Sequence, residues 1–180
     1  MGVSFDYFSA ASDEEASLVI DRVGGPGSQA KVTPLVEPKR GIFGRVRKPK
    51  APTSGKDTEL TIFDTVSGNG IDPVVQMGTL EELLTGRSFH DITFDPRSGH
   101  LVADRDGGEL LVVTLTDALS TALASASDED LEQAAVPWSE TEEFWDAVDP
   151  AVLAGFLKDL AGLARRAEAS GQGLYCWVCV

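Results

Sequence analysis

ITFDPRSGHLVADRDGGELLVVTL, residues 92–115, carries the clearest β-sheet signal in the chain. Two turn clusters within it, DPRSG at 95–99 and DRDGG at 104–108, separate three short apolar runs. Proline, glycine and aspartate favour turns, and short apolar runs between such clusters are typical of β-strands. We therefore predict a meander of three antiparallel strands across this stretch.

Upstream of the meander, the chain alternates side chains over residues 3–9 in a way that indicates a half-buried strand. Ser12 and Glu15 then have the spacing of a capping box, and apolar residues at helical spacing follow them. We predict that this helix ends at the glycine- and proline-rich run that begins at Gly24.

Two further elements are predicted between this helix and the meander. Residues 60–66 form an apolar run that favours a strand. A short helix is predicted over residues 80–85, because Thr79 and Glu82 have capping-box spacing and Gly86 is a typical C-terminal stop.

The C-terminal third is predicted to be mostly helical, because its apolar residues recur at helical spacing behind N-capping residues. The predicted pieces are a helix over residues 116–126, a short helix from Ser127, an interruption at Pro137, a piece capped by Ser139 that contains Phe144 and Trp145, and a long helix from Asp149 and Pro150 to Gly171. Residues 173–180 form a final apolar strand candidate. The whole pattern predicts an α+β fold, with an antiparallel or mixed sheet packed against several helices that come mainly from the C-terminal half.

Charge divides the chain into an acidic body and one basic segment. The net charge is −14, yet residues 31–56, here called the basic segment, contain eight lysines and arginines and a single acid, Glu37. The segment lies in a Gly/Pro-rich insertion at about residues 24–59 without helical or strand period, so we interpret 1–180 as one domain with a tether inserted. One interpretation of the segment is a solvated linker that contacts its own acidic body, which we favour. The other is a partner-binding element with an apolar anchor among the cations, formed by Lys39, Arg40, Phe43, Arg45, Arg47 and Lys48.

Few residues in the chain suggest catalysis or metal binding. Cys176 and Cys179 form a C-x-x-C, but they lie in a predicted strand, where residues three apart point to opposite faces. We interpret them as buried apolar cysteines rather than as a redox or metal site. His90, beside Asp91, and His100 are the remaining candidates for acid–base chemistry, and we interpret both as surface or hydrogen-bonding residues. We therefore predict no catalytic residue, no metal and no cofactor.

The N-terminal residues contain neither a basic region nor an apolar core of the kind that a signal peptide has, and no run approaches the roughly 18 apolar residues of a membrane span. We therefore expect a cytoplasmic protein that does not bind membranes. The net negative charge also argues against nucleic acid as a partner, because phosphates would be repelled.

Four features together resemble the YfbM-like family of small bacterial proteins of unknown function. These are the opening strand with Tyr7, the run LLTG at 83–86 followed by Phe89, the helix break around residues 127–130, and the last helix that leads through Gly171 into an apolar strand. The resemblance covers the chain apart from the insertion, and the terminal cysteine pair also departs from the family pattern. It implies an α+β fold and supplies no catalytic residues.

Three functions agree with these features. The first is a non-enzymatic, acidic protein-binding module, for example an immunity-type protein that neutralises a basic partner. The second is a small hydrolase or transferase that uses His90 or His100 with nearby carboxylates. The third is a regulator that contacts nucleic acid through the basic segment.

Overall fold

The computed structural model describes residues 2–28, 62–68, 70–144 and 148–180. The basic segment lies outside these residues, so the predicted partner-binding side chains do as well: Lys39, Arg40, Phe43, Arg45, Arg47 and Lys48.

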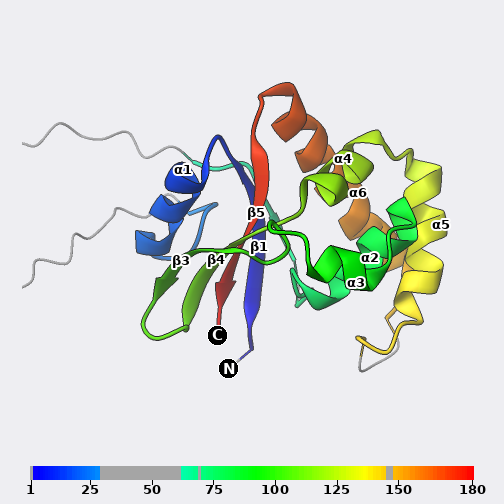
Figure 1. Ribbon diagram of the computed structural model, residues 1–180, viewed down its shortest axis with the longest axis horizontal. Helices are drawn as coiled ribbons and strands as arrows, with labels where there is room; N and C mark the ends of the chain where they lie inside the picture. The colour runs from blue at the N-terminus through cyan, green and yellow to red at the C-terminus, as the bar shows by residue number, and fades with distance from the viewer. Residues whose placement is uncertain (1, 29–61, 69, 145–147) are drawn as a thin grey trace, which may run out of the picture.

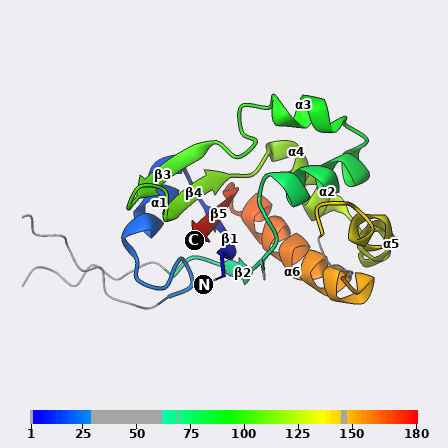
Figure 2. The same cartoon turned by 90° about the horizontal axis from the view of Figure 1, so that it is seen from below.

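The described strands form one antiparallel sheet of five strands in the order β2-β1-β5-β4-β3 (Figures 1 and 2). The central strand β5 comes last in the sequence and pairs with β1 over their whole lengths. A contact between segments so distant in sequence therefore forms the middle of the sheet. The strands are β1 (Ser4–Ala10), β2 (Thr65–Ser67), β3 (Leu101–Arg105), β4 (Leu110–Thr114) and β5 (Gly173–Cys179).

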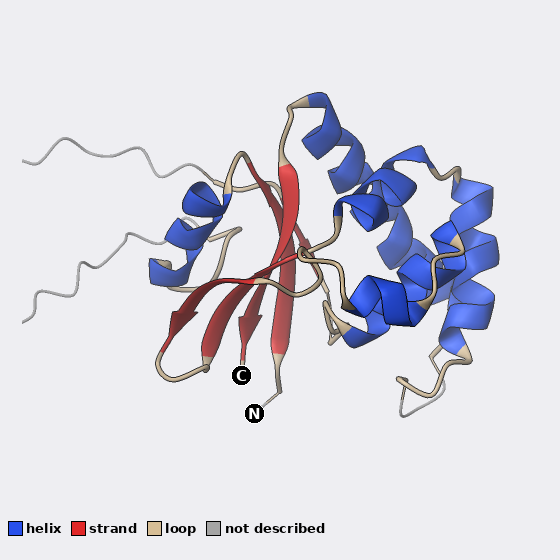
Figure 3. Cartoon of the chain, in the orientation of Figure 1, coloured by secondary structure: helices blue, strands red, loops and turns tan. Residues whose placement is uncertain are grey.

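The helices lie on both sides of this sheet, but unevenly (Figures 1 and 3). One side is covered by α1 (Asp13–Ser17) and the 3₁₀ turn η1 (Leu18–Asp21). The other side carries the larger helical layer, which consists of α2 (Val75–Thr85), α3 (Phe89–Thr93), α4 (Asp117–Ser125), α5 (Asp128–Ser139) and α6 (Pro150–Ala169). The predicted α+β fold, with helices mainly from the C-terminal half, is confirmed. Within the described residues no helix combines the length and the apolar character needed to span a bilayer.

Alternation along the strands gives each face of the sheet its own core. On β1, Phe5 and Tyr7 pack toward α6 and the helical layer, while Phe8 packs toward α1. Tyr7 is fully buried and its hydroxyl donates a hydrogen bond to the Ile71 carbonyl oxygen at 2.8 Å. Because side chains alternate between the two faces of each strand, the sheet packs against helices on both sides, and the fold has three layers.

The capping signals place several helix starts correctly. The Ser12 hydroxyl accepts from the backbone N–H of Glu15, and Ser127 and Asp130 form a reciprocal capping box at the start of α5. Asp149 accepts from the N–H of Ala151, directly before Pro150 in the first turn of α6. Side-chain oxygens in these positions satisfy backbone donors that have no partner inside the helix.

The predicted first strand of the meander is wrong, because Ile92 lies in α3. Ser88 caps this helix by accepting from the N–H of Asp91, and the Phe89 ring packs against α2, where a Cβ on Gly78 would lie 2.9 Å from it. The run at 92–94 therefore has a β-like composition, but a cap and a tertiary contact make its first residues helical. The other two predicted strands of the meander are confirmed as β3 and β4.

The predicted starts of α2 and β2 are displaced in the structure. α2 begins at Val75 rather than after Thr79, because the Asp72 carboxylate accepts from the N–H groups of Val74 and Val75. The hydroxyl of Thr79 donates to the Val75 carbonyl inside the helix instead of capping it. The predicted stop at Gly86 is confirmed, with a left-handed φ of 72°. β2 is the short strand Thr65–Ser67, later than predicted.

The predicted helix break at Pro137 is also wrong, because α5 continues to Ser139. Proline removes one helical hydrogen bond, but the last turn of α5 is held by Trp138, which is fully buried and donates from Nε1 to the Gln76 carbonyl oxygen at 2.9 Å. Ser139 therefore ends a helix rather than starting one, and residues 140–144 form turns. Trp145 lies outside the described residues.

Candidate functional site: an acidic helical face and its groove

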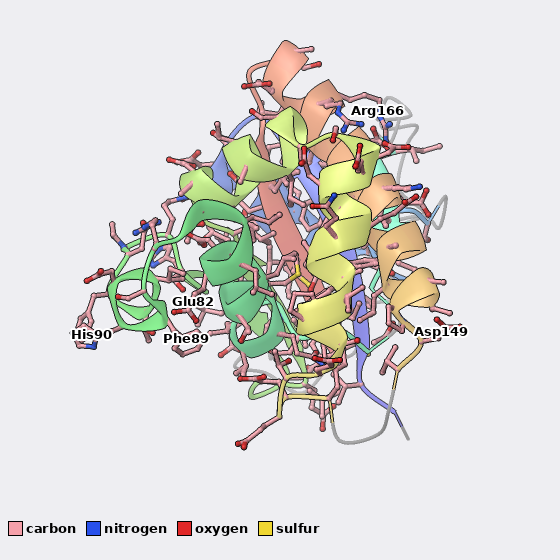
Figure 4. All side chains as sticks on the ribbon, turned by 90° about the vertical axis from the view of Figure 1, so that its right-hand side faces the viewer. Glu82, Phe89, His90, Asp149 and Arg166 are labelled. Atoms are coloured by element: carbon pink, nitrogen blue, oxygen red, sulfur yellow. The ribbon has the colours of Figure 1, made fainter. Side chains whose placement is uncertain are left out.

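Negative charge is concentrated in the sequence that builds the helical layer. Between Arg105 and Lys158 the chain contains no lysine or arginine. Several exposed or half-buried carboxylates of this stretch lie on α5 and on the turns after it, and we call them the acidic helical face: Asp128, Glu129, Asp130, Glu132, Glu140, Glu142 and Glu143. Figure 4 looks onto this side of the molecule, with α5 in front of α6.

Two carboxylates on the α1 side of the sheet, those of Asp13 and Asp21, have cationic partners. Asp13 accepts from Arg97 at 2.8 Å and from the Tyr175 hydroxyl at 2.9 Å, and Asp21 pairs with Arg105. The hydrogen bond from Arg97 lowers the pKa of the Asp13 carboxyl, and the Arg97 guanidinium lies over the Tyr175 ring. Asp13 and Asp21 are therefore neutralised by neighbouring arginines, whereas Glu14 and Glu15 of α1 form no ion pair among the described residues.

The acidic helical face itself divides along α5. On the side toward α6, Asp128 and Glu132 share Lys158, at 3.8 Å and 2.6 Å from its ammonium nitrogen. On the other side, Glu129 accepts from the neutral amide of Gln133, and Asp130 accepts from Ser127. The hydrogen bonds from Ser127 lower the pKa of Asp130, so this carboxyl stays ionised. No ion pair neutralises these two carboxylates within the part of the chain that the structure describes.

A groove of about 510 Å³ runs beside this unpaired side of α5, between α2, α4 and α5. Small side chains from α4 and α5 leave the space open, and two leucines of α2 form the facing wall. Leu83 keeps 41% of its surface exposed there, which is high for a leucine of a helix with a buried face. The lining residues are Leu83, Leu84, Ala122, Ser125, Ala126, Asp130, Gln133, Ala134 and Pro137.

A buried carboxylate fixes the walls of the groove. Glu81 is 1% exposed; its Oε1 accepts from Arg87 at 2.6 Å and its Oε2 accepts from the Thr116 hydroxyl at 2.5 Å. Thr116 is the N-cap of α4, and Arg87 also donates to Asp95 at 3.1 Å. One side chain thus joins α2 to the start of α4 and to the segments on both sides of α3.

The sequence did not single out Glu81 or the groove. Glu81 follows Leu80 and lies four residues after Met77, so it falls on the apolar face of α2. A carboxylate on an apolar helix face is unusual, and this position was the one feature of the sequence that could have indicated a buried, paired glutamate. The groove had no local signal, because α2 is separated in sequence from α4 and α5 and only the tertiary arrangement brings them together.

The two histidines are not brought together. His90 is exposed on α3, points away from the body of the molecule in Figure 4, and stacks edge-on against Phe94 with 4.8 Å between ring centroids. Its neighbour Asp91 accepts from the Ser88 hydroxyl. His100 is exposed before β3, near Asp13, whose pKa it helps to lower. Neither imidazole forms a hydrogen bond to a carboxylate among the described residues, and the enzymatic hypothesis stays a prediction.

The two cysteines point to opposite faces of β5, as predicted from the strand. Cys176 is fully buried in the core beneath the helical layer, and Cys179 packs against the core on the α1 side. Burial raises the pKa of the Cys176 thiol well above its ordinary value. Within the described residues, no group of three or more histidine, cysteine, aspartate or glutamate side chains is arranged to hold a metal ion.

Comparison of the chain with protein-family models, with curated proteins and with solved structures found no match. The resemblance to the YfbM-like family therefore stays a prediction, and the function has to be inferred from the surface itself.

Proposed function

We propose that the protein is a non-enzymatic, cytoplasmic protein-binding module of the immunity type, which neutralises a basic partner through its acidic helical face. The observation that carries this proposal is the gathering of carboxylates on α5 and the turns after it, in a stretch that contains no lysine or arginine between Arg105 and Lys158. Of these carboxylates, Glu129 and Asp130 accept only from neutral groups among the described residues.

A surface of this kind favours association with a cationic protein in two ways. Its summed field steers a basic partner toward it and raises the association rate, because fixed charges of one sign are gathered on one face. Contact then supplies cations to carboxylates that have no cationic partner among the described residues. Since the charges are exposed, the interaction is screened over roughly 8–10 Å at physiological salt and weakens as salt increases.

The test compares two variants with the same change in net charge. The first is Glu129→Gln, Glu140→Gln and Glu142→Gln, which neutralises three exposed carboxylates of the acidic helical face. The control is Asp104→Asn, Asp106→Asn and Glu109→Gln, which neutralises three exposed carboxylates around the β3–β4 turn. Asparagine tolerates the positive φ of 57° at Asp106.

We expect affinity capture from the cell of origin to retain a basic protein on the wild type at low salt and to release it at high salt. The first variant should bind the identified protein on the order of tenfold more weakly, because exposed ion pairs are worth about 0.2–1 kcal/mol each. The control should bind like the wild type. Recovery of no basic partner at either salt concentration, or equal weakening in both variants, would contradict the proposal.

A further inference from the structure

We propose that the groove between α2, α4 and α5 receives an amphipathic helix of the basic partner, with the apolar side of that helix against Leu83 and Leu84 and its lysines or arginines against Glu129 and Asp130. This inference rests on the proposed function and adds the place and the mode of binding.

The shape of the groove is set by helical register. Asp130, Gln133, Ala134 and Pro137 recur at three- and four-residue intervals, so they line one face of α5 along the length of the groove. Ala122 and Ala126 continue the lining at the end of α4. Because alanines occupy the positions where larger side chains would fill the space, the groove can admit side chains from outside.

The second feature of the groove that favours a partner helix is an exposed leucine side chain. Leu83 is 41% exposed, although a leucine side chain gains about 1.5–3 kcal/mol when it is fully buried. Apolar anchors from a partner would cover part of this surface, as in complexes in which a helix lies in a groove.

The carboxylates near the groove indicate which kind of partner would bind there. Lys158 neutralises the side of α5 that faces α6. Asp130, which lines the groove, and Glu129, one residue before it, have no cationic partner among the described residues. Both lie in the first turn of α5, at one end of the groove. A partner with cations at one end and apolar residues along one face therefore complements the groove, and an acidic or purely apolar partner does not.

A helix fits this groove better than an extended peptide. The walls are helices whose backbone N–H and C=O groups are bonded internally, so they offer few partners to the backbone of a strand. An extended segment would leave its own polar groups unpaired against alanine and leucine. A helix satisfies its backbone hydrogen bonds within itself and presents side chains at i, i+3, i+4 and i+7.

The probe for this inference is a synthetic helical peptide about 18 residues long, made of leucine, alanine and lysine with all leucines on one face; this length exceeds the minimum for an isolated helix. A second peptide has the same composition in an order without an apolar face. Binding is measured by titration at low salt, and the site is mapped by backbone amide chemical shifts of the isotope-labelled protein.

Two matched variants locate the contact. Ala134→Trp places a large side chain in the groove, and Ala151→Trp places the same side chain on the exposed first turn of α6. We expect the amphipathic peptide to bind at least tenfold more tightly than the rearranged peptide, with shifts centred on the groove. Ala134→Trp should abolish this preference and Ala151→Trp should preserve it. If Ala134→Trp does not fold, Ala134→Gln serves the same comparison.

The outcomes separate the two proposals. If both peptides bind equally, with shifts spread over residues 140–144, the groove is not the binding site and the acidic helical face retains its proposed function. If neither peptide binds at low salt, the groove proposal is refuted, and the capture experiment with the variant at Glu129, Glu140 and Glu142 decides the proposed function separately.

Discussion

Glu81 is the side chain whose replacement tests most directly how the candidate site is held together. Glu81→Gln keeps the shape of the side chain and removes the charge that Arg87 contacts at 2.6 Å. An amide keeps one oxygen that can accept from Arg87, but its NH₂ group can only donate to the Thr116 oxygen, so the Thr116 hydroxyl loses its acceptor. The substitution therefore removes the charge at the Arg87 contact and weakens the link between α2 and the start of α4.

The expected cost follows from burial. A hydrogen bond to a charged group contributes about 1.5–3 kcal/mol, and breaking a fully buried ion pair costs about 3–5 kcal/mol. Glu81 is 1% exposed, but the Arg87 side chain is 33% exposed and keeps its contact with Asp95. Arg87 can therefore recover part of its solvation, which places the loss in the free energy of unfolding at about 2 kcal/mol.

Urea unfolding measures this loss. With an m-value of about 2 kcal/mol/M, the unfolding midpoint should fall by about 1 M in Glu81→Gln. Glu82→Gln is the matched control, since Glu82 is exposed on the same helix and its oxygen accepts from the Phe89 N–H, which an amide oxygen can also do. Amide hydrogen exchange in α3 should increase in Glu81→Gln only. A midpoint for Glu81→Gln within about 0.25 M of the wild type would refute the assignment of Glu81 as the link between these helices.

Three further predictions concern groups whose surroundings differ between the folded and unfolded chain. Burial raises the pKa values of Cys176 and Tyr7 in the folded protein, so these groups ionise first in the unfolded chain. Stability should therefore fall by about 1.4 kcal/mol per pH unit for each group, above about pH 8.5 for Cys176 and above about pH 10 for Tyr7. Cys176→Ala should remove the loss between about pH 8.5 and 10, as measured by urea unfolding. Gly68→Ala should lower the free energy of unfolding by about 1–3 kcal/mol, because its Cβ would lie 2.6 Å from the Tyr7 ring. Gly155→Ala, whose Cβ would have nothing within 4 Å, should raise the free energy of unfolding by up to about 1 kcal/mol. Equal shifts of the melting temperature in the two variants would contradict this. The pKa of Asp13 is lowered in the folded protein, so its carboxylate contributes stability that is present above its unfolded pKa of about 3.9 and is lost as pH falls below that value. The Asp13→Asn variant should therefore lose less stability in acid than the wild type does. Identical acid unfolding transitions would count against this contribution.

Much of the fold could be predicted because its signals are local. The strands β3, β4 and β5 follow apolar runs between turns, and α5 and α6 start at the caps Ser127 and Asp149. In each of these cases the residues that decide the structure lie within a few positions of the element itself.

The errors occurred where distant contacts decide the structure. Ile92 has β propensity, but α3 forms because Ser88 caps it and the Phe89 ring packs on Gly78 of α2. Pro137 should break a helix, but the buried Trp138 holds the last turn of α5 against α2. In both cases tertiary packing overrides a local preference.

For the candidate site, only the negative sign of its net charge could be predicted from the sequence. The excess of carboxylates in the chain outside the basic segment is a property of the sequence, but the pairing of those carboxylates is not. Asp128 and Glu132 look the same as Glu129 and Asp130 in the sequence, and only the packing of α6 beside α5 gives Lys158 to the first two. The predicted partner-binding residues of the basic segment lie outside the described residues, so that prediction stays a prediction.

The carboxylates of the acidic helical face differ in what they do for the fold, and this separates structure from function. Asp130 caps α5 and is needed for its first turn. Glu140 is the C-cap of α5 through its backbone N–H, but the exposed side chains of Glu140 and Glu142 form no ion pair among the described residues, so their mutual repulsion opposes folding slightly. Neutralising such residues should leave stability unchanged or slightly increased while it weakens binding of a basic partner. On the proposed function, the charge of Glu140 and Glu142 costs the fold a little and contributes only to the complex.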